Sequence, residues 1–367
     1  MTTRGQSPPD SAVQNPLRVG VVGLEFGVRV HAPAFASLNA ARVVAVAGRD
    51  LQRTRTAADS LERLTDCPVA AYDSWSRMLD EAAIDVLTVA VPPASQPKIA
   101  VAAAQRGVAV FCEKPIASML GEAERLFAAV TASGVGHAVN FGFPEHPAWM
   151  KTRDWLFNMQ PKLQVRLAML AWHVESRSYR QSSILSWKTA LQDGGGALNN
   201  FGAHSIYYLE WLFGPLDRVL ARILPSRLVQ SEGPRLEAWL DFQSGSSVTV
   251  SIAVNCPARS QHRLEIYADE GMVELTDATS TGVFNAIKRG RDGTELRALD
   301  ALPANADVAR IWSTAQIAGR LVQQVRLGGR VRPDLEDGLR VSQVLDCMRR
   351  SDECGHWIEV PNERNRT

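Results

Sequence analysis

The sequence predicts an α/β protein, with a doubly wound parallel sheet in its N-terminal part and an α+β domain with a large, open, mostly antiparallel sheet in its C-terminal part. Between residues 15 and 142, short Val- and Ile-rich runs alternate with helical stretches, which is typical of repeated βαβ units. Further along, strand-like segments follow one another without helices, which indicates antiparallel pairing. We expect a flexible tail over residues 1–15, a first domain over residues 16–142 and a second domain over residues 143–367.

In the first domain the expected strands are apolar runs too short for helices. They cover residues 17–22, 43–47, 69–71, 86–91, 108–112 and 138–141. The helical stretches between them cover residues 51–63, 75–83, 95–106 and 119–132. Because the strands are apolar throughout, we expect helices on both faces of this sheet.

The second domain begins after a Pro-containing break at residues 143–147. A first strand is expected over residues 163–173, and a glycine run at residues 194–196 precedes a helix over 201–213. Further strands, many of alternating polarity, are expected at residues 218–225, 235–242, 247–255, 262–269 and 271–275. Helices return at residues 308–327 and 333–350, and one face of the sheet is left open to a partner.

The composition is that of an ordinary globular protein, with 46% hydrophobic and 22% charged residues. A formal net charge of +1 gives no overall field that would attract nucleic acid or an anionic membrane. The five cysteines form no C-x-x-C pair, which favours a reduced, cytoplasmic setting. No apolar run approaches the roughly 20 residues that span a bilayer, and no His, Cys, Asp and Glu cluster has metal-ligand spacing.

A glycine-bearing turn follows the first expected strand. Glycine there permits a tight turn and lets a diphosphate approach the N-terminus of the next helix. A complete G-x-G-x-x-G counted from Gly23 would need glycine at positions 25 and 28, which are Glu25 and Val28. The location in the first βα unit still predicts a dinucleotide site, formed by Gly23, Leu24, Glu25, Phe26 and Gly27.

Glu25 can act in two ways at this turn. A carboxylate is favourable at a helix N-terminus, so it could occupy the place of the diphosphate. It also lies four residues before Arg29, so a pair with Arg29 could draw it aside. We expect Glu25 to weaken coenzyme binding without abolishing it.

The end of the second strand lacks the carboxylate that would hold a ribose 2′-hydroxyl. Gly48 stands there, and Arg49 follows it. An arginine without a carboxylate suits a 2′-phosphate, so NADP(H) is favoured over NAD(H), unless Arg49 is merely a surface residue.

Four motifs occur in an order that is typical of one enzyme family. They are Glu113-Lys114-Pro115 after the fifth strand, the stretch from Gly194 to His204, Trp211-Leu212-Phe213-Gly214, and the stretch from Pro333 to Arg340. Together they resemble the Gfo/Idh/MocA oxidoreductase family over nearly the whole chain after residue 15.

The resemblance implies a Rossmann domain and an α/β domain whose open sheet often makes oligomer contacts, so a homodimer or homotetramer is expected. It implies hydride transfer between a nicotinamide and a carbon of a sugar, cyclitol or nucleotide-linked sugar. Lys114 would be the acid/base, Pro115 would follow a cis bond, and His204 would contact the reacting hydroxyl or carbonyl. Glu113 would orient either the loop or the coenzyme, which Pro92 would also contact.

The chemistry of Lys114 agrees with this role. Oxidation of an alcohol needs a base for the hydroxyl proton, and reduction of a ketone needs an acid. A free lysine has a pKa of about 10.4, and burial or a neighbouring oxidised nicotinamide would lower it.

Three positions depart from the pattern common in the family. Asn200 stands where an aspartate often precedes the histidine by four residues, so His204 lacks a counter-charge and should be neutral more often. Tyr207 and Gln96 stand where Asp and His are frequent. A site short of acidic groups fits reduction, with Lys114 as proton donor, slightly better than oxidation.

The remaining candidates surround the expected cleft. Asn140 lies near the domain junction, and Trp187 precedes the glycine run, so both are expected to contact substrate together with Lys114, Asn200 and His204. Trp187 is alternatively a core residue. His31, after the first turn, is expected to be structural.

The leading interpretation is therefore an NAD(P)-dependent oxidoreductase of a sugar-like substrate. The alternative is a dinucleotide- or sugar-binding sensor with degraded catalysis, which Glu25 and Asn200 favour. A structural partner of an active homologue is a third interpretation.

Overall fold

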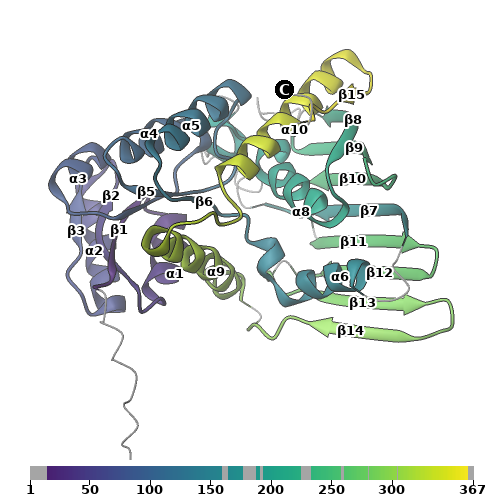
Figure 1. Ribbon diagram of the computed structural model, residues 1–367, viewed down its shortest axis with the longest axis horizontal. Coiled ribbons are helices and arrows are strands. Elements are labelled where there is room, and N and C mark those ends of the chain that lie inside the picture. The colour runs from purple at the N-terminus through teal and green to yellow at the C-terminus, as the bar shows by residue number, and fades with distance from the viewer. Residues whose placement is uncertain are drawn as a thin grey trace, which may run out of the picture.

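The computed structural model describes residues 15–158, 164–176, 187–190, 193–224, 233–257, 260–279, 281–303 and 305–362. The expected tail lies outside the described residues, apart from Asn15. The described part forms two sheets with helices between and around them (Figure 1).

The first sheet is parallel and has the strand order β3-β2-β1-β4-β5-β6. Its strands are β1 (Leu17–Val22), β2 (Ala41–Ala47), β3 (Ala70–Tyr72), β4 (Val86–Val89), β5 (Ala109–Cys112) and β6 (His137–Val139). This is the order of a Rossmann fold, and the order reverses between β1 and β4. A ligand crevice is therefore expected at the carboxyl ends of these strands.

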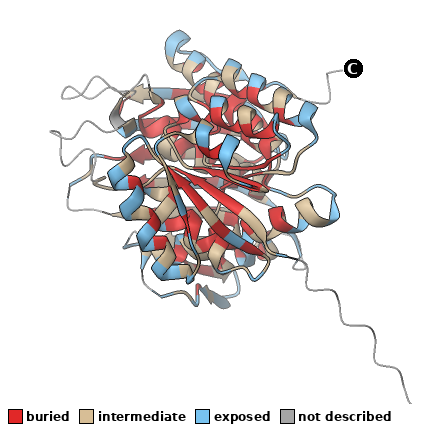
Figure 2. Ribbon diagram, turned by 90° about the vertical axis from the view of Figure 1, so that its left-hand side faces the viewer, coloured by how far each residue is buried: buried red, intermediate tan, exposed pale blue. Residues whose placement is uncertain are grey.

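Helices cover both faces of the first sheet, as its apolar strands predicted (Figure 2). One face packs on α3 (Trp75–Glu81), α4 (Gln96–Ala104) and α5 (Leu120–Ser133). The other face packs on η1 (Gly27–His31), α1 (Ala32–Ala36), α2 (Leu51–Thr65) and α9 (Ala306–Leu327). The late helix α9 thus completes the core of the first domain, with Ile317 and Leu321 packed in the same cluster as Phe35 and Phe111.

The second sheet is mixed and mostly antiparallel, with the order β14-β13-β12-β11-β7-β10-β9-β8-β15. Only the β10–β7 pairing is parallel among these strands. The strands are β7 (Val165–His173), β8 (Leu216–Leu224), β9 (Arg235–Phe242), β10 (Ser247–Ala253), β11 (Gln261–Ala268), β12 (Gly271–Asp277), β13 (Asn285–Gly290), β14 (Glu295–Leu299) and β15 (Ile358–Glu359).

One face of this sheet packs on helices, while the other carries exposed side chains such as Trp239. The covering helices are α6 (Pro147–Phe157), α8 (Ala203–Phe213) and α10 (Leu335–Cys354), and α10 also contacts α5 of the first domain. The expected fold class is confirmed.

Helix α6 and strands β13, β14 and β15 were not expected from the sequence. The proline-rich stretch that was taken as a break holds η3 (Phe143–Glu145), and Pro147 occupies the first helical position of α6, where a missing N–H costs nothing. Strand β14 is short and mostly exposed, so its brief polar–apolar alternation is a weak strand signal.

Candidate active site

The ends of three parallel strands gather the motif residues at one edge of the first sheet. Val89 of β4 pairs with Cys112 of β5, which pairs with Val139 of β6. Because these strands end level with one another, Glu113 and Asn140 emerge side by side.

Lys114 joins the two domains. Its Nζ donates a hydrogen bond to the main-chain carbonyl oxygen of Asn200 at 3.0 Å, and the peptide bond between Lys114 and Pro115 is cis, as expected. Burial lowers the pKa of Lys114 to about 8, with the charges of Lys188 and Arg310 acting in the same direction and Glu113 opposing them. The amine can therefore gain or lose a proton near neutral pH.

Gln96 clamps the main chain of this loop from the N-terminus of α4. Its Nε2 donates to the carbonyl oxygens of Glu113 (3.0 Å) and Pro115 (2.8 Å), and its Oε1 accepts the Glu113 N–H at 2.9 Å. The sequence singled out Gln96 only as a departure from the family pattern, and its clamping role became visible only with the fold.

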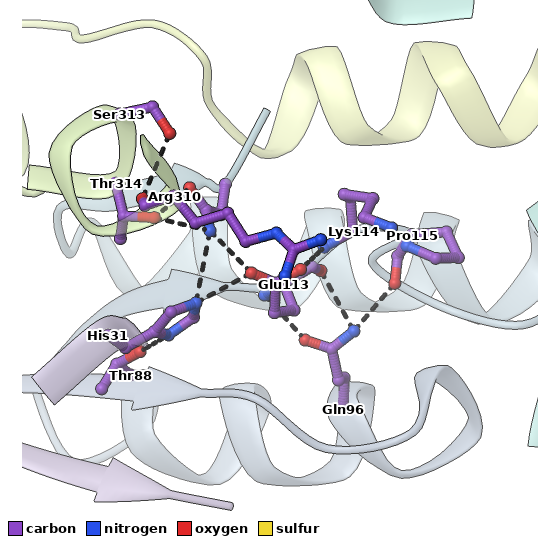
Figure 3. Close-up of polar contacts among 10 residues, drawn as sticks. His31, Thr88, Gln96, Glu113, Lys114, Pro115, Arg310, Ser313 and Thr314 are labelled. Atoms are coloured by element: carbon purple, nitrogen blue, oxygen red, sulfur yellow. Dashed lines mark hydrogen bonds and ion pairs between the residues drawn. The ribbon is translucent and has the colours of Figure 1, made fainter. Parts of the chain in front are cut away.

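Both carboxylate oxygens of Glu113 are used by the protein (Figure 3). Oε1 accepts from His31 and from the Asn140 amide, and Oε2 accepts the Lys114 main-chain N–H. Of the two roles expected for Glu113, these contacts favour orienting the loop. Asn140, an expected substrate contact, is buried in the same group of hydrogen bonds.

His204 approaches the site from α8, which continues the turn η6 (Leu198–Gly202). Its ring lies edge-on to Phe143, with ring centroids 4.9 Å apart, and its Nδ1 is buried without a hydrogen-bond partner among the described residues. Burial and the charge of Lys114 lower the pKa of His204 well below its usual value. The imidazole is therefore neutral near pH 7, in line with the absence of a carboxylate at Asn200.

The glycine run holds the segment of Trp187 and Lys188 close to the main chain. A Cβ on Gly195 would lie 2.5 Å from the Trp187 carbonyl oxygen, and the Gly196 N–H donates to the Lys188 carbonyl oxygen at 2.9 Å. Gly194 packs on the loop that follows Pro92, where its Cβ would lie 3.1 Å from Pro93. Trp187 is half-buried there, on η4 (Trp187–Thr189).

The first turn fits a dinucleotide. Gly23 has φ +115°, and a Cβ on it would lie 2.2 Å from the Ala90 carbonyl oxygen, so only glycine allows this approach. No side chain caps the N-terminus of η1. A diphosphate can therefore accept hydrogen bonds from the main-chain N–H groups of the turn that contains Leu24 and Phe26. Gly27, the first residue of η1, has no side chain that would block its approach.

Glu25 does not occupy that position. Its Oε1 lies 3.2 Å from Nη2 of Arg53 on α2, and its side chain is 79% exposed. The alternative partner considered from the sequence was Arg29, but Arg29 pairs with Asp307 of α9 at 3.1 Å. Pairing between residues four apart applies within one helix, whereas Arg53 and Asp307 lie on other helices, so the sequence pattern could not predict these two ion pairs.

The end of β2 is crowded by the side chains of Leu24 and Thr54. A Cβ on Gly48 would lie 2.6 Å from Leu24 Cδ1 and 2.7 Å from Thr54 Oγ1. The next acidic residue, Asp50, accepts the Arg53 N–H at 3.0 Å and caps α2. Arg49 is exposed beside it.

Two cations act on Lys114 from other parts of the chain. Arg310 of α9 points toward the loop of Glu113 and Lys114 (Figure 3), and Lys188 lies on η4. Arg310 is far from Lys114 along the chain, so no local pattern could reveal it.

Within the described ranges, no group of His, Cys, Asp and Glu side chains has the geometry of a metal site. Among the helices that the structure describes, none combines the length and the apolar character needed to cross a bilayer.

Two family models match most of the chain. Residues 17–141 match the GFO_IDH_MocA model, described as an oxidoreductase family with an NAD-binding Rossmann fold. Residues 166–360 match the model of that family's C-terminal alpha/beta domain.

Similar proteins span almost the full length of the chain. Levoglucosan dehydrogenase of Pseudarthrobacter phenanthrenivorans is 24% identical, over 94% of this chain and 98% of its own. D-xylose 1-dehydrogenase (NADP(+)) 2 of Haloferax volcanii is also 24% identical, over 93% of this chain and 99% of its own. A structure of levoglucosan dehydrogenase in complex with NADH and L-sorbose has a TM-score of 0.80 at 21% identity, over 95% of this chain and 100% of its own.

Proposed function

Because the chain belongs to the Gfo/Idh/MocA family of oxidoreductases, we propose that it transfers hydride between a nicotinamide coenzyme and a hydroxyl or keto carbon of a sugar-like or cyclitol substrate. Levoglucosan and D-xylose dehydrogenases among its relatives support a substrate of this class. The free cysteines among the described residues are consistent with action in the cytoplasm.

The observation that carries this proposal is the placement of Lys114. A bound nicotinamide would supply or accept the hydride at the substrate carbon. In the reducing direction the Lys114 ammonium gives its proton to the carbonyl oxygen, and in the oxidising direction the neutral amine takes the hydroxyl proton. The hydrogen bond from Nζ to the Asn200 carbonyl holds the amine where the two domains meet.

His204 supports a polar substrate without exchanging a proton. A neutral imidazole can donate from one nitrogen and accept at the other, so it can orient the reacting oxygen. Trp187, and the Asn200 side chain, are proposed to bind the remaining ring and hydroxyl groups of the substrate.

The coenzyme is proposed to be NADP(H). Position 48 is a glycine packed against Leu24 and Thr54, so no carboxylate stands there, and Asp50 is engaged in capping α2. Arg49 and Arg53 therefore present two cations where the adenosine ribose is expected, and arginine is well suited to a phosphate. The D-xylose dehydrogenase relative, named for NADP(+), supports this assignment.

A substrate screen tests the proposal. The purified protein is incubated with NADPH or NADH and a panel of ketoses, ketocyclitols and aldonolactones, and with NADP⁺ or NAD⁺ and the corresponding alcohols, while absorbance of the reduced nicotinamide is followed. Turnover of at least one sugar-like compound is expected. Coenzyme binding by fluorescence without any turnover would instead support the sensor interpretation, and no binding at all would favour the structural-partner interpretation.

A further inference from the structure

We propose that His31 is a positioning residue that keeps the Glu113 carboxylate ionised and aimed, and thereby sets the protonation of Lys114. This inference rests on the proposed acid/base role of Lys114. Nothing in the sequence pattern of the first turn assigned His31 more than a structural role.

The His31 side chain is completely buried, yet both of its ring nitrogens have partners (Figure 3). Nε2 lies 2.8 Å from Glu113 Oε1, and Nδ1 contacts Thr88 Oγ1 on β4. With the proton on Nε2, the ring donates to the carboxylate and Nδ1 accepts the threonine hydroxyl proton, so a neutral imidazole satisfies both. The rings of Phe26 and Phe111 lie edge-on at 5.4 and 5.1 Å and fix its plane.

A second donor reaches the same oxygen from β6. The Asn140 amide nitrogen lies 2.7 Å from Glu113 Oε1 and 3.1 Å from Thr314 Oγ1 of α9. The carboxylate oxygen Oε1 is thus held directly by His31 and Asn140, and Thr314 contacts Asn140 in turn. The other oxygen, Oε2, accepts the Lys114 main-chain N–H at 3.2 Å.

These donors decide whether the buried carboxylate carries a charge. Burial alone would raise the pKa of Glu113, but the hydrogen bond from His31, the charge of Lys114 and the Asn140 hydrogen bond hold it below its usual value. The Glu113 side chain is only 13% exposed, so water cannot replace a lost donor easily.

The charge of Glu113 matters because the other groups that act on Lys114 are cations. Lys188 of η4 and Arg310 of α9 lower the pKa of Lys114, whereas Glu113 raises it. Two further titratable groups lie near this loop among the described residues: His204, whose pKa is lowered by burial and by the charge of Lys114, and Cys112, whose pKa burial raises to about 12. Loss of the Glu113 charge would therefore lower the pKa of Lys114 further and reduce the fraction of ammonium that can donate its proton at neutral pH.

The experiment measures the pKa of Lys114 in the full-length protein without substrate or coenzyme. Competitive labelling with acetic anhydride over a range of pH, with quantification of the Lys114 peptide by mass spectrometry, gives this value. His31→Leu removes the donor to Glu113 and is expected to lower the pKa of Lys114 by about one unit, in the same direction as Glu113→Gln. His31→Gln, whose amide nitrogen can take the place of Nε2, is expected to restore most of the wild-type value.

The matched control is His137→Leu, a partly buried histidine at the amino-terminal end of β6, whereas Glu113 and Asn140 follow the carboxyl ends of β5 and β6. It is expected to leave the pKa of Lys114 unchanged. If His31→Leu does not fold, Thr88→Val removes the hydroxyl at Nδ1 with little change of shape, and a smaller decrease is expected.

A folded His31→Leu variant, or a folded Thr88→Val variant if the first does not fold, with the wild-type pKa at Lys114 would overturn the inference and leave His31 a packing residue. The labelling needs no turnover, so failure of the proposed reaction and failure of this inference are separate results. Once a substrate is known, the pH profile of kcat should move with the Lys114 pKa in each variant.

Discussion

Arg53 and Glu25 form an exposed ion pair between α2 and the first turn, and this pair provides a test of coenzyme selectivity. Arg53→Ala is expected to weaken NADPH binding about 10- to 100-fold, because a charge-assisted hydrogen bond contributes roughly 1.5–3 kcal/mol. NADH lacks the 2′-phosphate, so its affinity should change little. Fluorescence titration of both coenzymes provides the measurement, and Arg55→Ala, an exposed arginine on the same helix, is the control.

Equal losses of NADPH and NADH affinity in Arg53→Ala would show that Arg53 does not recognise the 2′-phosphate. In the reciprocal variant Glu25→Gly, loss of the competing carboxylate should tighten NADPH binding. An NADPH affinity of Glu25→Gly no higher than that of the wild type would contradict the expectation that Glu25 weakens coenzyme binding.

Lys114 predicts the direction of the pH dependence. Burial first, and then neighbouring cations, lower its pKa to about 8, so the ammonium is present below that pH and is lost above it. Reduction needs the ammonium, so kcat should be level below about pH 8 and fall up to tenfold per unit above it. Oxidation needs the free amine and should show the opposite limb. Initial rates in both directions check this, and a level profile across pH 8 in both would contradict it.

Single residues differ in how far the sequence could predict them. Lys114 and Gly23 belong to local motifs whose chemistry can be recognised along the chain. Arg310 and Thr314 come to the site on α9, nearly 200 residues after Lys114, and Gln96 acts through main-chain contacts that exist only in the folded loop. Such contacts depend on which elements pack together, so local patterns could not reveal them.

At the scale of elements, α9 is a late helix that completes an early core. Leu321 is fully buried against the first sheet, so Leu321→Ala should lower the free energy of unfolding by about 2–5 kcal/mol. Leu327→Ala, on the same helix but with its side chain 82% exposed, should change it by no more than about 0.5 kcal/mol. Urea unfolding followed by far-UV circular dichroism measures both, and similar small effects would mean that α9 is not part of this core.

The sequence predicted the first sheet well because its strands are short, apolar and punctuated by helices. The expected helix over residues 308–327 agrees closely with α9. Its packing on the first domain could not be predicted, because an amphipathic pattern shows which face of a helix is buried but not which element covers that face. Strand β14 escaped prediction because it is an exposed edge strand of only five residues, too short for a clear pattern.

At the scale of the whole molecule, the open face of the second sheet predicts self-association. Trp239 is 49% exposed beside a groove of about 390 Å³ lined by β7, β9, β10 and β11. If this face joins copies of the chain, Trp239→Glu should reduce the assembly to monomers, because a charge would be buried without a partner. Light scattering after size exclusion measures the mass, with Leu64→Glu on α2 as a control on another exposed hydrophobic residue.

A wild-type protein that is monomeric at micromolar concentration, or a Trp239→Glu protein of unchanged mass, would contradict this assembly. The sequence indicated an open face through its alternating strands but could not give the number of subunits, because alternation reports burial and not the geometry of a partner.

Lys114→Met shows whether Lys114 exchanges the substrate proton, because it removes the amine while keeping a side chain of similar length. Once the screen has identified a substrate, kcat of this variant is expected to fall about 10²- to 10⁴-fold, with NADPH affinity within a few-fold of wild type. A variant that retains kcat within a few-fold would contradict the assignment of Lys114 as the acid/base.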